Sequence, residues 1–294
     1  MSFKSTQEVI DVMSNFEGLY DFIRIVDPVR KIIISDEETN EINNSIHCYD
    51  FWQKGMSCEN CISYRALNEN NTFMKVRFRN EEIYLVTSSP VKINDKKYVM
   101  EMLKNITKLN IVPNIYEKNA SEIEEIIDDL NSKAITDELT NVYNRRHLNE
   151  MLPIDMNFAL SNKTMLSIIL MDLDYFKQIN DVYGHIAGDL ILKEISKIMK
   201  SSIRKGFDWA ARYGGDEFLI SLPGADSAAA HRIAEVVRKR IEKTEITFQG
   251  NKINITVSMG VYTMDSEEIS FEELIKRADK NMYEAKNRGR NTVV

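Results

Sequence analysis

A Gly-Gly pair between two strand-like runs is the feature that most constrains the fold of this chain. In "DWAARYGGDEFLISLPG" (208–224), Gly214 and Gly215 separate two runs rich in apolar residues. A two-residue loop of this composition predicts a tight β-hairpin, and therefore an antiparallel sheet. Asp216 and Glu217 follow the turn at once, although acids are poor strand formers and repel each other at close range. The acidic pair is either a solvated hairpin corner or a site for a cation.

The segments around the hairpin, from about residue 137 onward, alternate between strand and helix patterns. "TMLSIILMDLD" is typical of a buried strand that ends in acids, and "DSAAAHRIAEVVRKRIEK" of an amphipathic helix. The expected order is a strand at 164–174, two helical stretches in 175–203 broken at Gly184, the hairpin, a helix at 226–243, a strand at 253–264 and a helix at 270–289. This β-α-α-β-β-α-β-α order predicts an α+β domain with a ferredoxin-like arrangement and extra elements.

Three carboxylates are expected to meet at one end of this sheet. The strand at 167–172 ends in Asp172, and its expected neighbour begins with Asp216 and Glu217. Such a cluster is costly alone, but its oxygens are ligands that Mg²⁺ prefers. Successive strand residues point to opposite faces, so both acids of the pair can reach one ion only if the glycine turn distorts the alternation.

Residues 1–112 show a different pattern. An opening helix, "TQEVIDVMSNF", precedes two strands, "YDFIRIVD" and "RKIIIS", and two short helices, "CYDFWQKG" and "CENCISYRALNEN". Three successive strands follow, "TFMKVRFR", "EEIYLVTSSPVKI" and "KKYVMEMLKNIT". An α+β sheet with helices on one side is expected. The pattern resembles a PAS-type sensor domain, most clearly where "VMEMLKNIT" leads into a connector helix.

The connector, 113–136, carries a narrow apolar stripe in an acidic setting. Ile123, Ile127, Leu130 and Ala134 are spaced 4, 3 and 4 residues apart. This spacing is heptad-like over about two heptads. It indicates either an amphipathic helix lying on a domain or a helix that pairs with its copy in a dimer.

Composition limits the classes of function. The 294 residues suffice for about two domains, and the formal net charge of −7 argues against a broad nucleic-acid footprint. The first residues lack the order of a signal peptide, and the apolar runs fall far short of the ~20 residues of a membrane span. The three cysteines indicate no disulfide framework. We expect a cytoplasmic protein with no nucleic-acid or membrane partner.

Four stretches of the segment 137–294 carry motifs in a specific order. They are "DELTNVYNRR", "MDLDYFKQINDVYGHIAGD", "RYGGDEF", and the closing "SMGVY" with "ADKNMYEAKNRGRN". Together they resemble the GGDEF family, the diguanylate cyclases, whose domain is a ferredoxin-like nucleotidyl-cyclase palm. The resemblance implies that two GTP molecules are condensed into cyclic di-GMP with release of two pyrophosphates. It also implies a homodimer, because each subunit holds one GTP and a complete site needs two subunits.

The resemblance assigns the acids to a metal. Asp172, the backbone carbonyl of Leu173 and Asp216 would bind Mg²⁺ or Mn²⁺, and Glu217 would lie near the attacking hydroxyl as its base or as a ligand of a second ion. Lys177 would stabilise charge on the phosphate. Without the resemblance, the sequence would indicate an ordinary solvated lysine on a helix.

The resemblance also implies that further residues of these motifs bind the substrate. Lys286 and Arg290 would clamp the triphosphate, although both also suit a basic helix end. Asn180 and Asp189 would read the guanine edge, although both also suit helix caps. The resemblance further places Phe176, as packing or through its backbone N–H, and His185 at the substrate site. Because Asp189 is the GTP-selective residue type, we expect GTP alone as substrate.

An inhibitory product site is expected to be degenerate. The Arg-x-x-Asp motif that precedes the glycine pair in many relatives has Lys205 at its first position and Asp208 at its last. Arg204 is one residue out of register, and a slip of the loop around Gly206 could bring it in.

The cysteines lie in the N-terminal half: Cys48, Cys58 and Cys61, with His47 beside the first. The Cys-x₂-Cys spacing suits a metal or redox centre, whereas buried structural thiols are the ordinary alternative. Two functions compete with a sensor-regulated cyclase. One is an inactive GGDEF domain that serves as a receptor for GTP or cyclic di-GMP. The other is a redox or metal sensor that acts through protein contacts.

Overall fold

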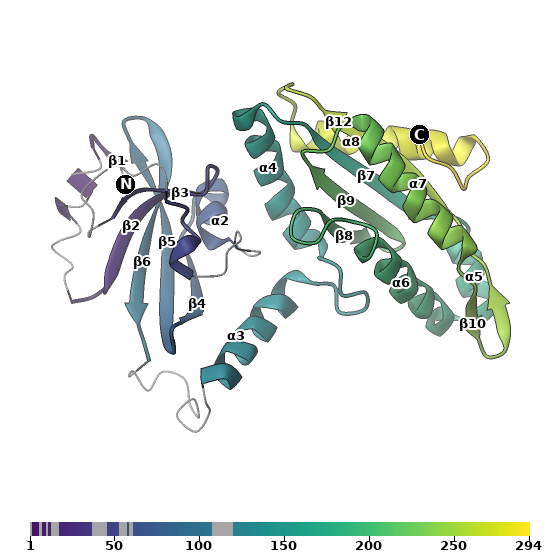
Figure 1. Cartoon of the computed structure of the whole chain (residues 1–294), viewed down its shortest axis with the longest axis horizontal. Helices are drawn as coiled ribbons and strands as arrows, with labels where there is room; N and C mark the ends of the chain where they lie inside the picture. The colour runs from purple at the N-terminus through teal and green to yellow at the C-terminus, as the bar shows by residue number, and fades with distance from the viewer. Residues whose placement is uncertain are drawn as a thin grey trace. The chain divides into compact units, whose positions relative to one another are not determined.

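A computed structural model describes residues 2–5, 8–9, 11–12, 18–36, 46–52, 58, 61–107 and 120–294. The chain divides into two compact units, Met1–Ser132 and Lys133–Val294 (Figure 1). Among the described residues, no helix has both the length and the apolar character that a membrane crossing requires.

The N-terminal unit is built on a six-stranded sheet. Its strands are β1 (Ser2–Phe3), β2 (Phe22–Asp27), β3 (Ile32–Asp36), β4 (Phe73–Arg79), β5 (Glu82–Ile93) and β6 (Lys96–Asn105). The order is β1-β5-β6-β2-β3, and β4 pairs with the first half of β5. The helices α2 (Ile62–Glu69) and η1 (Asp50–Trp52) supply Ile62 and Trp52 to a core shared with β5 and β6.

The expected α+β character of this unit is therefore confirmed, with five predicted strands present and a short β1 in addition. The opening helix predicted over "TQEVIDVMSNF" falls largely outside the described residues. The connector contains α3 (Ala120–Ile135). Of its predicted stripe, Ala134 is exposed, and the side chains of Ile123, Ile127 and Leu130 lie outside the described part.

The C-terminal unit has a four-stranded sheet in the order β12-β7-β9-β8. The strands are β7 (Leu166–Leu173), β8 (Trp209–Gly214), β9 (Glu217–Pro223) and β12 (Val257–Met264). All three pairings are antiparallel. Numbered along the chain, the order is 4-1-3-2, which is that of a ferredoxin-like βαββαβ sheet.

Helices cover both faces of this sheet (Figure 1). The helices α5 (Phe176–Tyr183), α6 (His185–Lys200) and α7 (Ser227–Lys243) share one core with Ile169 and Met171 of β7. The helices α4 (Arg145–Asn162) and α8 (Phe271–Asn287) share the other core with Ile168 and Leu170. Alternate residues of β7 thus serve opposite cores, which explains why this strand is continuously apolar.

Two elements were not expected from the sequence. The helix α4 begins at an Asn144 cap, whose side chain accepts a hydrogen bond from the backbone N–H of His147, and it continues through Pro153. Its apolar periodicity is weak, so the cap was the only strong local signal. A small hairpin, β10 (Ile246–Phe248) with β11 (Asn251–Ile253), also precedes β12.

Candidate functional site

The ends of β7 and β9 bring two acids face to face. Asp172 pairs directly with Glu217 in the register of the two strands. Their neighbours two residues away, Leu170 and Leu219, both belong to the core beneath α4 and α8. Because side chains alternate along a strand, Asp172 and Glu217 project toward that same face. The predicted adjacency of these two strands is confirmed.

The glycine turn distorts the strand alternation as the acidic pair requires. The β8–β9 register shifts between Arg212 and Gly214, and Gly214 pairs with Glu217. Gly215 has a φ of +54°, in the left-handed region that glycine adopts easily. A Cβ built on either glycine would meet no atom within 4 Å, so the space above the turn is open. The bulge leaves Asp216 in the turn, where its charge adds to the effect of burial in raising the pKa of both Asp172 and Glu217.

Arg212 ties this turn to a distant motif. Its Nε donates to the carbonyl of Gly215 at 2.9 Å, and its Nη1 donates to the carboxylate of Asp137 at 3.2 Å. Asp137 also accepts bonds from the backbone and hydroxyl of Thr140. The first and third motifs of the sequence are thus joined by one guanidinium, which fixes the shape of the turn.

Lys286 lies against the acids. Its Nζ is 2.8 Å from Oδ2 of Asp172, and it comes from the last turn of α8. Burial raises the pKa of Asp172, and repulsion from Asp216 adds to the rise, while Lys286 opposes it. Burial likewise raises the pKa of Glu217, followed by repulsion from Asp172 and Asp216. The site therefore holds more negative charge than Lys286 alone offsets.

The acids suit a hard cation, although their arrangement is not a closed cage. Among the residues that the structure describes, no group of three or more His, Cys, Asp or Glu side chains is arranged to hold a metal ion. Mg²⁺ commonly takes only one or two protein carboxylates and completes its shell with water and phosphate oxygens. The surplus carboxylate charge at the open turn fits that mode of binding.

The other two basic residues expected at the site, Arg290 in the turn after α8 and Lys177 in α5, are placed differently from Lys286. Arg290 is half-buried, and its guanidinium lies over the Tyr175 ring, 4.6 Å from the centroid. Lys177 is exposed at the start of α5, one residue beyond the buried Phe176. No contact joins Arg290 or Lys177 to the carboxylates among the described interactions, so only Lys286 of these three is brought onto the acids.

The expected guanine-reading residues lie where α5 meets α6. Asn180 is half-buried, and its Oδ1 is buried without a hydrogen-bond partner among the described residues. Asp189 and His185 are both exposed on α6. Between them, Gly188 lies so close to Asn180 that an added Cβ would collide with Oδ1 and crowd the Phe176 ring. No role for Gly188 was expected from the sequence.

Gly188→Ala should therefore displace the Asn180 side chain; if Asn180 reads guanine as the sequence motif implies, GTP binding should weaken by about tenfold, the equivalent of one hydrogen bond. Calorimetric titration of GTP measures the change, with circular dichroism to verify folding. The matched control is Asn180→Ala: in that background Gly188→Ala should cost much less, because only the crowding of the Phe176 ring remains. Full additivity of the two losses would contradict the proposed contact.

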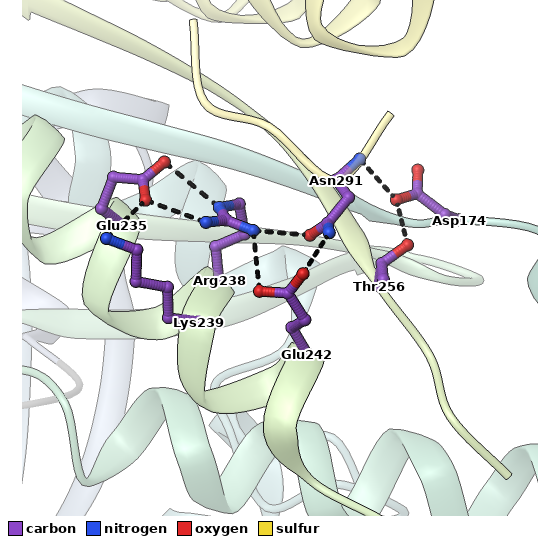
Figure 2. Close-up of polar contacts among 7 residues, drawn as sticks. All are labelled: Asp174, Glu235, Arg238, Lys239, Glu242, Thr256 and Asn291. Carbon is purple, nitrogen blue, oxygen red and sulfur yellow. Dashed lines mark hydrogen bonds and ion pairs between the residues drawn. The ribbon is translucent and has the colours of Figure 1, made fainter. Parts of the chain in front are cut away.

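A polar network that the sequence did not predict anchors the C-terminal turn (Figure 2). The buried carboxylate of Asp174 accepts bonds from the hydroxyls of Thr256 and Ser258 and from the backbone N–H of Asn291. The side chain of Asn291 accepts a bond from Arg238 at 2.8 Å and donates one to Glu242 at 2.7 Å. This network holds the residue next to Arg290. Only its place as the last residue of the strand predicted at 164–174 could have drawn attention to Asp174.

The expected inhibitory motif has a different pairing from the predicted register. The buried Asp208 accepts bonds from Nε and Nη2 of Arg204, the shortest at 2.6 Å, and also from its backbone N–H. Lys205 is exposed. The loop around Gly206, with φ of +81°, thus brings Arg204 rather than Lys205 onto the acid.

The three cysteines all line one small cavity in the N-terminal unit. Burial raises the pKa of Cys48 and of Cys61 well above that of an ordinary thiol. His47 is exposed and stacks on Tyr49. Burial of Cys48 and Cys61 suits packed structural thiols; a metal or redox role of the three cysteines stays a prediction.

Comparisons with known proteins bear on the C-terminal unit. Residues 134–292 match the family model "Diguanylate cyclase, GGDEF domain". Diguanylate cyclase A of Treponema denticola is 46% identical over 138 residues, covering 47% of this chain and 37% of that protein. Response regulator PleD of Caulobacter vibrioides is 39% identical over 163 residues, covering 55% of this chain and 36% of that protein. The chain thus spans little more than a third of the length of these relatives.

A solved structure is similar as well. The coiled coil and GGDEF domain of DgcB from Caulobacter crescentus, in complex with c-di-GMP, matches with a TM-score of 0.55 at 27% identity. The match covers 59% of this chain and 92% of that one.

Proposed function

The chain belongs to the GGDEF family of diguanylate cyclase domains, and from this premise we propose that it condenses two GTP molecules into cyclic di-GMP and releases two pyrophosphates. The observation that carries the proposal is the direct pairing of Asp172 with Glu217 beside Lys286, at the open glycine turn. A substrate with a triphosphate and a reacting hydroxyl needs these same groups: carboxylates for metal and proton, and a cation for phosphate.

In the proposed reaction, the 3′-hydroxyl of each GTP attacks the α-phosphorus of the other. A new P–O bond forms, the bond to pyrophosphate breaks, and the hydroxyl proton must be accepted. We assign Glu217 as the acceptor, because its raised pKa brings its basicity closer to neutral pH. Lys286 and Arg290 would hold the leaving phosphates, and Lys177 would reach them from α5.

Asp172, Asp216, Glu217 and the carbonyl of Leu173 are the groups that would hold Mg²⁺ or Mn²⁺. When bound, the ion neutralises triphosphate charge and lowers the pKa of the attacking hydroxyl. Lys286, which pairs with Asp172 in this structure, would then be released to bind phosphate.

Base selection is assigned to Asp189 with Asn180. Asp189→Ser should admit ATP, because a carboxylate accepts both donors of the guanine edge but faces the lone pair of adenine N1. We expect GTP preference in a GTP/ATP competition to fall by at least about tenfold. The matched control is Asp181→Ser, an exposed acid on the neighbouring helix. Undiminished GTP selectivity in Asp189→Ser would remove Asp189 from the guanine site.

Product feedback is expected to be weak. Asp208 is fully engaged by Arg204, with none of its side chain exposed, and Lys205 lacks the planar fork of arginine. Cyclic di-GMP should bind one to two decades more weakly than to a site with a free arginine fork, about 1–3 kcal/mol. Titration calorimetry tests this, with Lys205→Ala as a variant that should change little. Tight, multi-equivalent binding that is lost on Asp208→Ala would overturn the expectation.

The N-terminal unit is proposed to act as a PAS-like sensor that regulates a homodimeric cyclase through α3. The support is a sheet whose strands β2 to β6 pair antiparallel, with short helices on its core, followed by a 16-residue helix with acidic character. A sensor that changes how often two half-sites meet would set the rate.

The deciding experiment incubates the purified full chain with GTP and Mg²⁺ and separates the nucleotides. Cyclic di-GMP and pyrophosphate in a 1:2 ratio are expected. Binding of GTP or cyclic di-GMP with no turnover would favour the alternative function, an inactive receptor.

A further inference from the structure

The turn that carries Arg290, directly after α8, has an unusual backbone. Gly289, Arg290 and Asn291 follow one another with positive φ values of +109°, +66° and +46°. Glycine adopts such values easily, but in the other two residues the Cβ lies close to the following carbonyl oxygen, which costs free energy. A backbone of this kind persists only where the surrounding structure holds it. The bonds of this turn therefore show what keeps Arg290 in place.

Asn291 is held from two sides (Figure 2). On one side, its backbone N–H donates to Oδ2 of Asp174 at 3.0 Å. On the other side, its side chain bonds to Arg238 and Glu242, which both belong to α7. The bond to Asp174 ties the turn to the segment that directly follows β7.

The carboxylate of Asp174 is fixed before it reaches Asn291. Asp174 is only 3% exposed. Its Oδ1 accepts a bond from the hydroxyl of Ser258 at 2.7 Å, and its Oδ2 accepts one from the hydroxyl of Thr256 at 2.7 Å. Its backbone N–H also donates to the carbonyl of Thr256 at 2.9 Å. A carboxylate that is buried and bonded in this way does not face a substrate, but it offers Asn291 an acceptor in one defined position.

The residue after Asp174 makes the second contact that orients Arg290. Tyr175 precedes α5 with a φ of +58°, and the Arg290 guanidinium lies over its ring, 4.6 Å from the centroid. An aromatic face attracts a guanidinium and leaves the N–H groups at the edge of the guanidinium free. Among the described interactions, the Arg290 side chain donates no hydrogen bond, so its planar fork stays available to phosphate oxygens. Asp174 thus holds both the backbone next to Arg290 and the ring on which Arg290 rests.

We propose that Asp174 is a positioning residue that fixes Arg290 for the outer phosphates of GTP, through its bond to Asn291 and through Tyr175. The inference rests on the proposed function, in which Arg290 holds the leaving phosphates. Asp174 directly follows Asp172 and Leu173, the groups proposed to hold the metal ion. One short segment then sets the distance between the metal ligands and the phosphate clamp, so that both meet the same triphosphate.

The test measures nucleotide binding to the full chain by calorimetry in the presence of Mg²⁺. One probe is guanosine 5′-(α,β-methylene)triphosphate, from which pyrophosphate cannot leave, so that binding is read without turnover. The second probe is GMP, which keeps the base and lacks the outer phosphates. Asp174→Ala should weaken binding of the triphosphate analogue by about tenfold, through a misplaced charged contact, and should leave GMP binding unchanged. A general loss of structure would weaken both.

A double-mutant cycle connects the effect to Arg290. Arg290→Ala should itself weaken binding of the analogue by about tenfold, and Asp174→Ala in that background should add no further loss. Asp174→Asn should keep most of the binding, because its amide oxygen can still accept from Asn291 while its NH₂ group donates to the Ser258 hydroxyl.

Asn291→Ala tests the same link from the half-buried side of the turn, without a change at the buried carboxylate. Alanine tolerates the left-handed backbone less well than asparagine and loses both bonds to α7, so binding of the analogue should weaken while GMP binding stays unchanged. The matched control is Gln249→Ala, which changes another amide residue with a positive φ, +48°, exposed in the β10–β11 turn. It should leave the binding of both probes unchanged.

Additive losses for Asp174→Ala and Arg290→Ala, or equal losses of analogue and GMP binding, would overturn the inference and leave the proposed function standing. A loss in Asp174→Asn as large as that in Asp174→Ala would also overturn it, by showing that the charge is needed rather than the hydrogen bonds. If Asp174→Ala does not fold, unchanged binding of the analogue by Asn291→Ala overturns the inference by itself. No binding of the analogue by the parent chain would overturn the proposed function, and this inference with it.

Discussion

Glu217→Gln should reduce the rate of cyclic di-GMP formation by about 10²–10⁴-fold, the contribution typical of a positioned general base. The amide keeps the size of the side chain and its place opposite Asp172, but it cannot accept the proton of the attacking hydroxyl. GTP should still bind, because Lys286, Arg290 and the residues proposed to read guanine are unchanged. Single-turnover kinetics with equilibrium binding of GTP separate the two effects.

The matched control for this variant is Glu272→Gln, which changes an exposed glutamate in the first turn of α8. It should leave turnover unchanged. Turnover retained in Glu217→Gln would remove Glu217 from the chemistry. Loss of both turnover and GTP affinity would instead indicate that Glu217 mainly holds the metal with its triphosphate.

Gly260→Ala should destabilise the C-terminal unit by about 3 kcal/mol, at the upper end for overpacking of a core. A Cβ on Gly260 would collide with the backbone carbonyl of Ala278 and the backbone N–H of Met282, so α8 must move away from β12. For a unit of this size the midpoint of thermal unfolding should fall by roughly 6–12 °C. Since α8 also carries Lys286, its 2.8 Å contact with Asp172 should be lost with the shift.

The matched control is Gly214→Ala, because a Cβ there meets no atom within 4 Å. Its unfolding midpoint should stay near that of the parent chain in differential scanning calorimetry. Equal midpoints for Gly260→Ala and Gly214→Ala would show that β12 and α8 do not need the close approach seen in the structure.

The local signals of the sequence were sufficient for the sheet and for the acids. The Gly-Gly pair predicted the β8–β9 hairpin, and the apolar run ending in Asp172 predicted β7, because turn chemistry and side-chain periodicity act over a few residues. The helix α4 was not predicted, because its apolar pattern is weakly periodic. Packing on the second face of the sheet, rather than helix propensity, stabilises it.

Only the tertiary structure decided how distant residues meet. The bond from the backbone of Asn291 to Asp174 joins residues 117 apart, and no short-range pattern indicates it. The partner of Asp208 depended on how the loop at Gly206 turns, and the backbone placed Arg204 there instead of Lys205. The need for glycine at 188 and 260 arises from side-chain and backbone atoms of other elements. The sequence therefore determined which chemical groups this protein carries and which strands present them, because those depend on local patterns. Folding decided which groups touch, because contacts between elements depend on packing across the whole unit.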